Sequence, residues 1–297
     1  MRQFTIRHYG TEPHRDVRIV AQNVLRTTQR EVETVEVMGI YSLLSEYVDS
    51  EAVDVLVEAG ATVDDDTLRG DLTATPAVQN AVVALLSDSL LVAEFRDKKG
   101  DPVFARVDSD ADSVYLDVPE YRRLDDAASP DQLARLFPVS SECDAIRAEN
   151  GTNPASGTDL TEYAMYGEES NRASAVSSLW SDLLRLNRLP SSVSLCGLTA
   201  VLRQTAPDAL EALQLAGATQ DEIVISGEVT ASQDILQALQ AAWGDGIHYV
   251  RCRDERGDPL VLRDGPRSDY LYLTAAEREQ LGAWAAETVR PSNRWQM

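Results

Sequence analysis

The 297-residue chain has almost no lysine: Lys98 and Lys99 are its only two, and arginine supplies the rest of its 27 cationic side chains. Aspartate and glutamate number 49, which leaves a formal net charge of -22 at pH 7. This shortage of positive charge argues against a general nucleic-acid binder, because a phosphate backbone needs a basic face. A lysine-poor, acidic surface is typical of halophilic proteins, since a Debye length of about 3 Å in molar salt screens repulsion among carboxylates. We expect a halophilic origin; the alternative is an acidic mesophilic protein from a GC-rich genome.

Cysteine, histidine and long apolar runs are also scarce. The cysteines, Cys143, Cys196 and Cys252, are odd in number and widely spaced, so they suggest neither a disulfide framework nor a zinc site. His8 and His14 lie six residues apart, which is not a clean helical spacing, and we expect no metal. No apolar run approaches the roughly 18 residues of a membrane span, and the first residues lack the apolar stretch of a secretory signal. We expect a cytoplasmic protein without a membrane span, or a virion component assembled in the cytoplasm.

The short motifs of common active and cofactor sites are missing as well. The sequence contains no Gly-x-Ser-x-Gly elbow, phosphate-binding loop, dinucleotide fingerprint, His-Glu-x-x-His or Cys-x-x-Cys. Pairs of carboxylates are abundant, but in so acidic a chain they do not identify an acid and a base. We therefore predict a non-enzymatic protein with no catalytic residue and no cofactor. An enzyme of unrecognised type is an alternative, which a deep pocket with converging polar groups in both copies of the repeat described next would favour.

The sequence does contain an internal repeat with an offset of 157 residues. Residues 46–124 align with residues 203–281 without a gap, and about 24 of the 79 paired positions are identical. Upstream, the match continues after a slip of one residue. We predict a tandem duplication, with a first repeat at residues 1–127, a linker at residues 128–161 and a second repeat at residues 162–297.

Several residues shared by the two repeats have side chains suited to turns and to ion pairs. They are Gly60 and Gly217, Gly70 and Gly227, Arg96 and Arg253, Gly100 and Gly257, Pro102 and Pro259, and Arg106 and Arg263. The pattern Arg-Asp-x-x-Gly-Asp-Pro predicts a hairpin turn with a left-handed glycine; the alternative is a ligand-gripping loop. For Arg106 and its equivalent we expect a pair with a carboxylate of the same sheet, Asp97 or Asp112 in the first copy. The alternative is an interface between the copies.

Hydrophobic periodicity predicts the elements of one repeat. Expected helices cover residues 15–28, 37–47, 50–59, 76–86 and 119–124, and expected strands cover residues 67–72, 91–96, 103–107 and 114–117. In the second copy the closing helix is longer, at residues 275–289. This order fits an α+β fold in which each copy is a small antiparallel sheet of three or four strands with helices on one face. A winged-helix-like unit, with the hairpin as the wing, is the alternative.

Both ends of the chain stand out from its acidic average. The first 30 residues contain six arginines against Glu12 and Asp16, and tryptophan and arginine recur near the C-terminus. We expect contacts with other protein subunits or further copies of the chain through Arg2, Arg7, Arg15, Arg18, Trp284, Arg294 and Trp295. The sequence favours a structural or interaction protein, a subunit of a larger assembly in a halophilic archaeon or one of its viruses. A winged-helix-like, nucleic-acid-associated regulator is the alternative.

Overall fold

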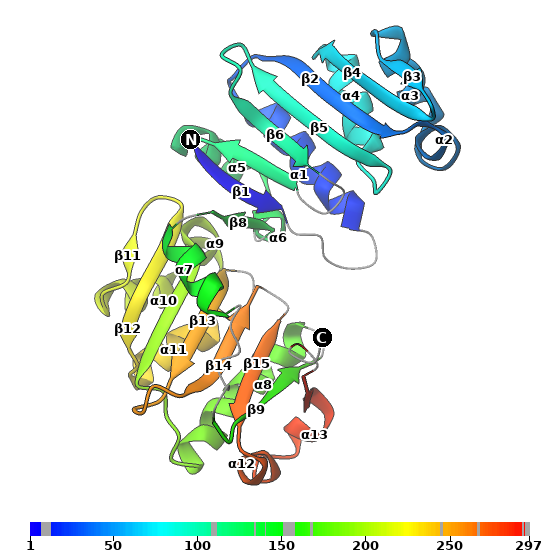
Figure 1. Ribbon diagram of the computed structural model, residues 1–297. Helices are drawn as coiled ribbons and strands as arrows, with labels where there is room; N and C mark the ends of the chain where they lie inside the picture. Colours follow the sequence, from blue (N-terminus) through cyan, green and yellow to red (C-terminus); the bar gives the residue numbers. More distant parts are fainter. Residues whose placement is uncertain are drawn as a thin grey trace. The chain divides into compact units, whose positions relative to one another are not determined.

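The computed structural model of the chain divides into two compact units, unit 1 at Met1–Val139 and unit 2 at Ser140–Met297 (Figure 1). The structure describes residues 1–6, 13–107, 112–133, 135–139, 141–150, 158–166, 169–243, 246–265, 268–292 and 294. Each unit consists of an eight-stranded antiparallel sheet and the helices that pack on it. The predicted fold class, an α+β tandem duplication, is confirmed.

Unit 1 has the strand order β3-β4-β2-β5-β6-β7-β1-β8. The strands are β1 (Arg2–Ile6), β2 (Val32–Ile40), β3 (Thr62–Asp64), β4 (Thr67–Thr73), β5 (Leu90–Asp97), β6 (Pro102–Val107), β7 (Asp112–Leu116) and β8 (Leu136–Pro138). The helices are α1 (Pro13–Thr27), α2 (Tyr41–Leu43), the π-helical turn η1 (Leu44–Val48), α3 (Ser50–Glu58), α4 (Pro76–Leu85), α5 (Val118–Ala127) and α6 (Pro130–Leu133).

Unit 2 has the equivalent order β11-β12-β10-β13-β14-β15-β9-β16. Its strands are β9 (Thr161–Met165), β10 (Ser192–Leu198), β11 (Thr219–Gln220), β12 (Val224–Thr230), β13 (Ile247–Arg253), β14 (Pro259–Asp264), β15 (Asp269–Leu273) and β16 (Val289–Pro291). Its helices are α7 (Ser141–Asn150), α8 (Glu169–Arg185), α9 (Thr199–Thr205), α10 (Pro207–Leu215), α11 (Gln233–Ala241), α12 (Ala275–Glu279) and α13 (Trp284–Thr288).

The internal repeat appears as a repeat of element boundaries. The elements α3, β4, α4, β5, β6 and β7 each begin 157 residues before α10, β12, α11, β13, β14 and β15, as in 207 − 50 = 157. The short strands β3 and β11 fall between them at the same offset, and no other described element does. The one-residue slip places β2 and β10 at an offset of 158, with Gly39 on Gly197. The predicted correspondence between residues 46–124 and 203–281 is therefore confirmed.

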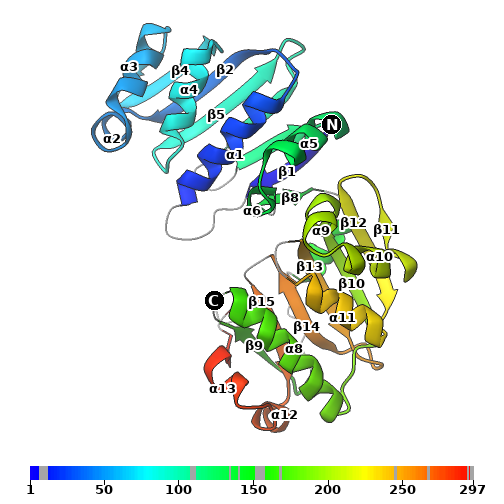
Figure 2. The same ribbon diagram turned by 180° about the vertical axis from the view of Figure 1, so that it is seen from behind.

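In each sheet, one face carries the hydrophobic core. Along β2, the buried side chains of Val35 and Val37 alternate with the exposed side chains of Glu36 and Met38, as the pleat of a half-covered strand requires. The helices α1, α3, α4 and α5 cover the face of the sheet on which Val35 and Val37 lie. Figure 2 shows these helices in front of the sheet. No helix among the described residues of unit 1 lies on the opposite face, which we call the outer face.

Helix starts follow ordinary capping chemistry. The Thr75 hydroxyl accepts a hydrogen bond from the Val78 amide at 3.3 Å, with Pro76 in the first turn of α4. Helix α5 begins with a capping box, in which the Asp117 side chain accepts from the Glu120 amide and the Glu120 side chain accepts from the Asp117 amide. These caps fix where each helix leaves the sheet.

Two of the predicted helices are wrong in part. The helix expected at residues 37–47 is wrong in its first four residues, which end strand β2, because Val35, Val37 and Gly39 recur every second residue rather than every third or fourth. From Tyr41 onward the chain is helical, in α2 and η1. Residues 275–289 form two short helices instead of one, with Gly282 between them. The Gly282 amide donates to the Asp182 carboxylate at 2.8 Å, which holds the break in place.

The sheets are also larger than the three or four strands expected, because β1, β2, β3 and β8 all add to the predicted set. The predicted hairpin is β5–β6, which lies between β2 and β7 in the interior of the sheet. A wing stands at the edge of its unit, so the winged-helix-like alternative is wrong for the fold. The end segments belong to the folded units too: β1 pairs with β7, and β16 pairs with β9.

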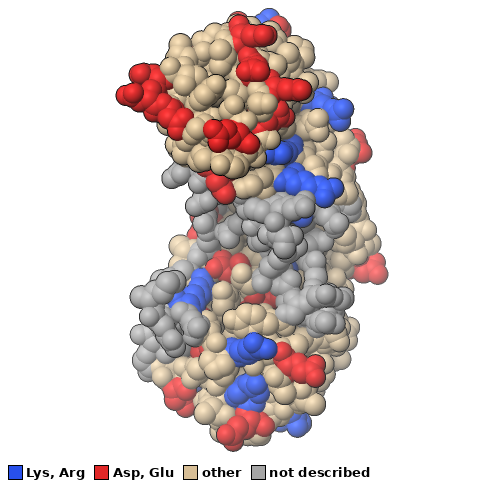
Figure 3. Space-filling model, turned by 90° about the vertical axis from the view of Figure 1, so that its right-hand side faces the viewer, with Lys and Arg blue, Asp and Glu red and all other residues tan. Residues whose placement is uncertain are grey.

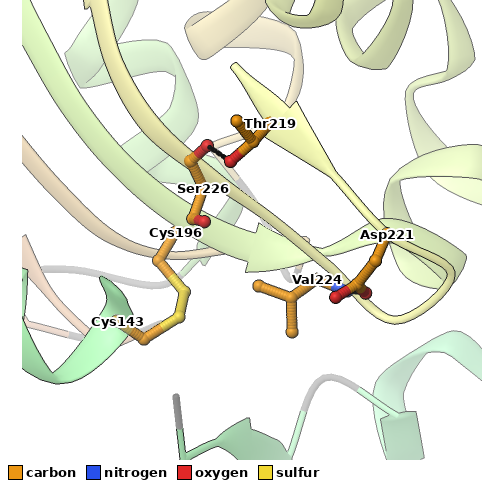
Figure 4. The surroundings of a disulfide bond; sticks show 6 residues. All are labelled: Cys143, Cys196, Thr219, Asp221, Val224 and Ser226. Carbon is orange, nitrogen blue, oxygen red and sulfur yellow. Dashed lines mark hydrogen bonds between the residues drawn. A yellow bond between two sulfur atoms is a disulfide. The ribbon is translucent and has the colours of Figure 1, made fainter. Parts of the chain in front are cut away.

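The segment predicted as a linker contributes to both units. Its strand β8 joins the first sheet beside β1, and its helix α7 packs on β10 and β13 of the second. A disulfide bond joins Cys143 of α7 to Cys196 of β10 (Figure 4). The cysteine spacing does not predict this single bridge, because the fold brings together two cysteines that lie 53 residues apart, to a Cα–Cα distance of 5.5 Å. Cys252 is free and buried.

Carboxylates dominate one end of unit 1. The helix α3 and the turn after β3 expose Glu51, Asp54, Glu58, Asp65 and Asp66. Figure 3 shows acidic side chains gathered in the upper part of the view. Within the described ranges, every helix is too short or too polar to cross a bilayer.

Candidate functional site

The hairpin loops after β5 and β13 share one geometry. The Asp97 carboxylate accepts hydrogen bonds from the amides of Lys99 at 2.9 Å and Asp101 at 3.0 Å, and Gly100 has a φ of +82°. In unit 2 the equivalent aspartate accepts two loop amides at 2.9 Å, and Gly257 has a φ of +83°. The turn chemistry predicted from sequence is confirmed, because glycine adopts a left-handed φ without steric cost.

Beside the hairpin loop of unit 1, Arg30 is the centre of an ionic cluster. Its Nε lies 2.8 Å from Glu120 Oε1, and its Nη1 lies 3.7 Å from Asp97 Oδ2. Burial would by itself raise the pKa of Glu120, but hydrogen bonds from Thr28, the Asp117 amide and Arg30 outweigh it and lower that pKa. The cluster joins the segment before β2, the hairpin loop and the start of α5.

Unit 2 repeats this cluster around Arg188. Its Nη1 lies 3.1 Å from Glu277 Oε2, and its Nη2 lies 3.0 Å from Asp254 Oδ2. The sequence comparison missed both arginines, although the one-residue slip pairs them, as 188 − 30 = 158. In the sequence, Arg30 stands out only as one of the six arginines of the first 30 residues.

Each arginine cluster lines a cleft, of about 380 Å³ in unit 1 and about 550 Å³ in unit 2. In each cleft the arginine binds the aspartate of the hairpin loop and so stabilises the loop. The pairs are Arg30 with Asp97 and Arg188 with Asp254. The rims differ, because Lys98 and Lys99 in unit 1 correspond to Glu255 and Arg256 in unit 2. The clefts thus share a structural cluster and present different charges to a ligand.

A second ion pair lies inside each core. Arg106 and Asp112 are fully buried, and Arg106 Nε and Nη2 lie 2.7 and 2.8 Å from the two carboxylate oxygens. Arg106 Nη1 also donates to the Ser87 carbonyl at 2.6 Å. In unit 2, Arg263 contacts Asp269 at 3.3 Å. The expected pairing with a carboxylate of the same sheet is confirmed, with Asp112 rather than Asp97 as the partner.

The outer face of unit 1 carries a row of apolar side chains across three strands. Met38 of β2 lies opposite Val92 of β5, and Val92 lies opposite Val107 of β6. Met38 is 37% exposed and Val107 is 68% exposed. We call these three residues the apolar row. Such a row within a polar sheet face is typical of an interaction surface.

The equivalents of Met38 and Val92 in unit 2 lie beneath α7. They are Cys196 and Tyr249, and both of these residues are buried. Val107 corresponds to Asp264, which lies opposite Tyr249 and pairs with Arg294. Figure 1 shows α7 in front of β10 and β13, on the face opposite α8, α10 and α11. The helix is held at its start by the disulfide of Cys143, and at its end by Asn150, whose Oδ1 accepts from Arg251 Nε at 3.1 Å. The two copies thus differ in whether this face is covered.

Unit 2 has an apolar groove of its own, of about 360 Å³, between α8 and α11. Trp180 and Leu236 line it, together with Leu184 and Leu189, which are 62% and 40% exposed. The groove gives the second unit a further surface on which apolar groups of a partner would be desolvated.

The structure describes five of the seven arginines and tryptophans expected to contact partners. Arg2 lies in β1 opposite Leu116, and Arg15 is exposed on α1. Arg18 Nε donates to the Leu86 carbonyl at 3.1 Å, so this arginine joins α1 to the end of α4. Arg7, Trp295 and His8 lie outside the described residues.

The two remaining candidates have contacts within unit 2. Trp284 Nε1 donates to Asp182 Oδ2 at 2.8 Å, which packs α13 against α8. Arg294 Nη2 lies 2.7 Å from Asp264 Oδ2, and its guanidinium lies 4.9 Å from the centre of the Tyr270 ring. These contacts show how the C-terminal region is attached to its own sheet.

Among the described residues, no group of three or more histidine, cysteine, aspartate or glutamate side chains is arranged to hold a metal ion. No protein-family model, curated protein or solved structure matches the chain. Its function is therefore inferred from these surfaces alone.

Proposed function

We propose that the chain is a non-enzymatic interaction protein, a subunit of a larger assembly. The observation that supports this most is the difference between the two copies at the outer face: helix α7 covers it in unit 2, and Met38, Val92 and Val107 remain uncovered in unit 1. Burial of an apolar row is favourable, by roughly 25 cal/mol per Å² of apolar surface removed from water. A second chain that covers the apolar row would obtain that stabilisation.

The net charge of -22 supports a place for this assembly in a halophilic archaeon or one of its viruses. In molar salt, charges contribute little to affinity over distances beyond about 3 Å, whereas apolar contact is retained. An interface centred on methionine and valine suits those conditions. The proposed partners are other protein subunits or further copies of the chain.

Sedimentation of the tagged chain from a lysate of its host, in molar salt, tests this proposal. We expect the wild-type chain to sediment within a complex larger than itself, and Val107→Glu to sediment as the free chain. Leu215→Glu is the matched control, because Leu215 is 82% exposed at the end of α10 in unit 2 and is not part of the apolar row, so this variant should sediment as wild type. A wild-type chain that sediments alone at every concentration would overturn the proposal.

A further inference from the structure

We propose that the apolar row of unit 1 binds an amphipathic α-helix of a partner protein, laid across β2 and β5 as α7 is laid across β10 and β13. This inference rests on the proposed function and names the kind of partner. Because the two units are copies of one fold, the covered face of unit 2 shows which element fits this face of the sheet.

A helix suits this position and an added strand does not. Each of the strands β2, β5 and β6 already has a hydrogen-bonded neighbour on both sides, so none offers a free edge to an extended peptide. Only side chains are presented to a partner, and a helix buries a row of side chains by laying one stripe across them. In unit 2, that stripe consists of Cys143, Ile146 and Asn150, at the i, i+3 and i+7 positions of α7, and all three are buried.

The charges beside the apolar row specify the third position of the stripe. In unit 2, Asn150 accepts a hydrogen bond from Arg251, which lies opposite Ser194 in the sheet. The equivalent pair in unit 1 is Glu94 opposite Glu36, and two carboxylates directly across a strand pair repel each other. Arg96 lies 2.6 Å from Glu94, and Glu36 is exposed. The partner helix therefore has apolar residues at i and i+3 and an arginine or lysine at i+7.

Stapled helical peptides based on residues 141–150 test this inference on the full chain. The staple is needed because a helix of ten residues is marginal in water. The first peptide carries Cys143→Leu and Asn150→Arg, and the second carries Cys143→Leu and Asn150→Glu. Fluorescence anisotropy, in the lowest salt at which the chain stays folded, should show the arginine peptide binding at least tenfold more tightly than the glutamate peptide.

Variants of the chain locate the binding. Val92→Glu should remove binding of the arginine peptide, Leu215→Glu should leave it unchanged, and Glu94→Arg should reverse the preference between the two peptides. Because Val92→Glu could alter the sheet itself, Met38→Cys provides a second measurement. In a thiol–disulfide buffer, it should form a mixed disulfide with a peptide that keeps Cys143, several-fold more than Leu215→Cys does.

Three results would overturn the helix as the occupant. The first is no binding of either peptide while the chain still sediments in a complex, which leaves the proposed function intact. The second is equal binding to wild type and Val92→Glu. The third is a dimer in light scattering that Val92→Glu dissociates, because a second copy would then cover the apolar row. A chain that sediments alone overturns the proposed function itself.

Discussion

Arg106 and Asp112 show how a single charged pair can be conserved between two copies for structural reasons. Both side chains are fully buried, and each copy places its arginine against the aspartate that begins the next strand. Removing one partner of a buried pair leaves a charge without compensation in a medium of low dielectric constant. This explains why the repeat retains the pair although many apolar residues around it have changed.

Replacing Arg106 should therefore be far more costly than replacing an exposed arginine. We expect Arg106→Met to lower the free energy of unfolding by about 3–5 kcal/mol, and Arg106→Met with Asp112→Leu to recover much of the loss. Arg69→Met is the matched control, because Arg69 pairs with Asp64 at 3.3 Å while both are exposed, and it should cost less than about 1 kcal/mol. Urea unfolding measures all three, and equal losses at the two sites would contradict the structural role.

The hydrogen bonds to Glu120 predict a dependence on pH. Because its pKa is lower in the folded chain than in the unfolded chain, its charge contributes stability above the usual glutamate pKa. That contribution is lost as the pH falls through the lowered pKa. The difference in unfolding free energy between wild type and Glu120→Gln should be largest at neutral pH and shrink in acid. A Glu120→Gln difference that grows in acid would contradict this.

At the scale of elements, the sequence predicts local structure well and sheet neighbours poorly. The hairpin β5–β6 follows from Asp97, Gly100 and Pro102, because turn chemistry is set within a few residues. The expected helix at residues 37–47 takes in the last four residues of strand β2, although Val35 and Val37 alternate with the exposed Glu36 and Met38. The pairing of β1 with β7 and β8 joins segments more than a hundred residues apart, which no local pattern reveals.

The candidate site was predicted only in part, for the same reason. The sequence predicts two possible carboxylates for Arg106, Asp97 and Asp112, and both recur in the second copy. The structure shows that Asp112 is the partner. No sequence pattern marks Met38 as part of a surface. Its role depends on the folded sheet, where it lies opposite Val92, and on the comparison with its equivalent Cys196, which α7 covers. The disulfide of Cys143 could not be predicted from the spacing of three cysteines.

The disulfide bond that joins α7 to β10 gives a separate prediction. A crosslink between residues 53 apart removes conformational freedom from the unfolded chain, and bridges of this kind contribute about 2–4 kcal/mol. Cys143→Ser should lower the stability of unit 2 by that amount, and adding Cys196→Ser should cost little more. Hydrogen exchange should rise in α7 and leave β2 and β5 of unit 1 unchanged. Unaltered exchange in α7 would show that the disulfide does not hold the helix.

For the molecule as a whole, two properties stand out: one fold occurs twice, and the chain is strongly acidic. Exposed carboxylates on α3 and after β3 repel one another in dilute buffer, and salt screens that repulsion. The melting temperature should rise between dilute buffer and molar KCl, as circular dichroism would show. An unchanged or lower melting temperature in molar KCl would remove the case for a halophilic origin.

Duplication also explains how one surface can be free to acquire a partner. The two sheets need the same buried arginine–aspartate pairs and the same hairpin clusters, so these residues are retained. The outer face is under no such constraint, and in one copy it is covered by a helix of the chain itself. In the other copy the same face is open to a helix from elsewhere.

Hydroxyl-radical footprinting of Met38 tests the interaction role most directly. Labelling of Met38, Val92 and Val107 is compared by mass spectrometry between the native complex in its host lysate and the purified chain, at equal salt. We predict that all three are labelled several-fold less in the complex, whereas Tyr47, which is 77% exposed on η1, is labelled equally in both. Equal labelling of Met38 and Val107 in the two samples would contradict the proposal that a partner covers this face.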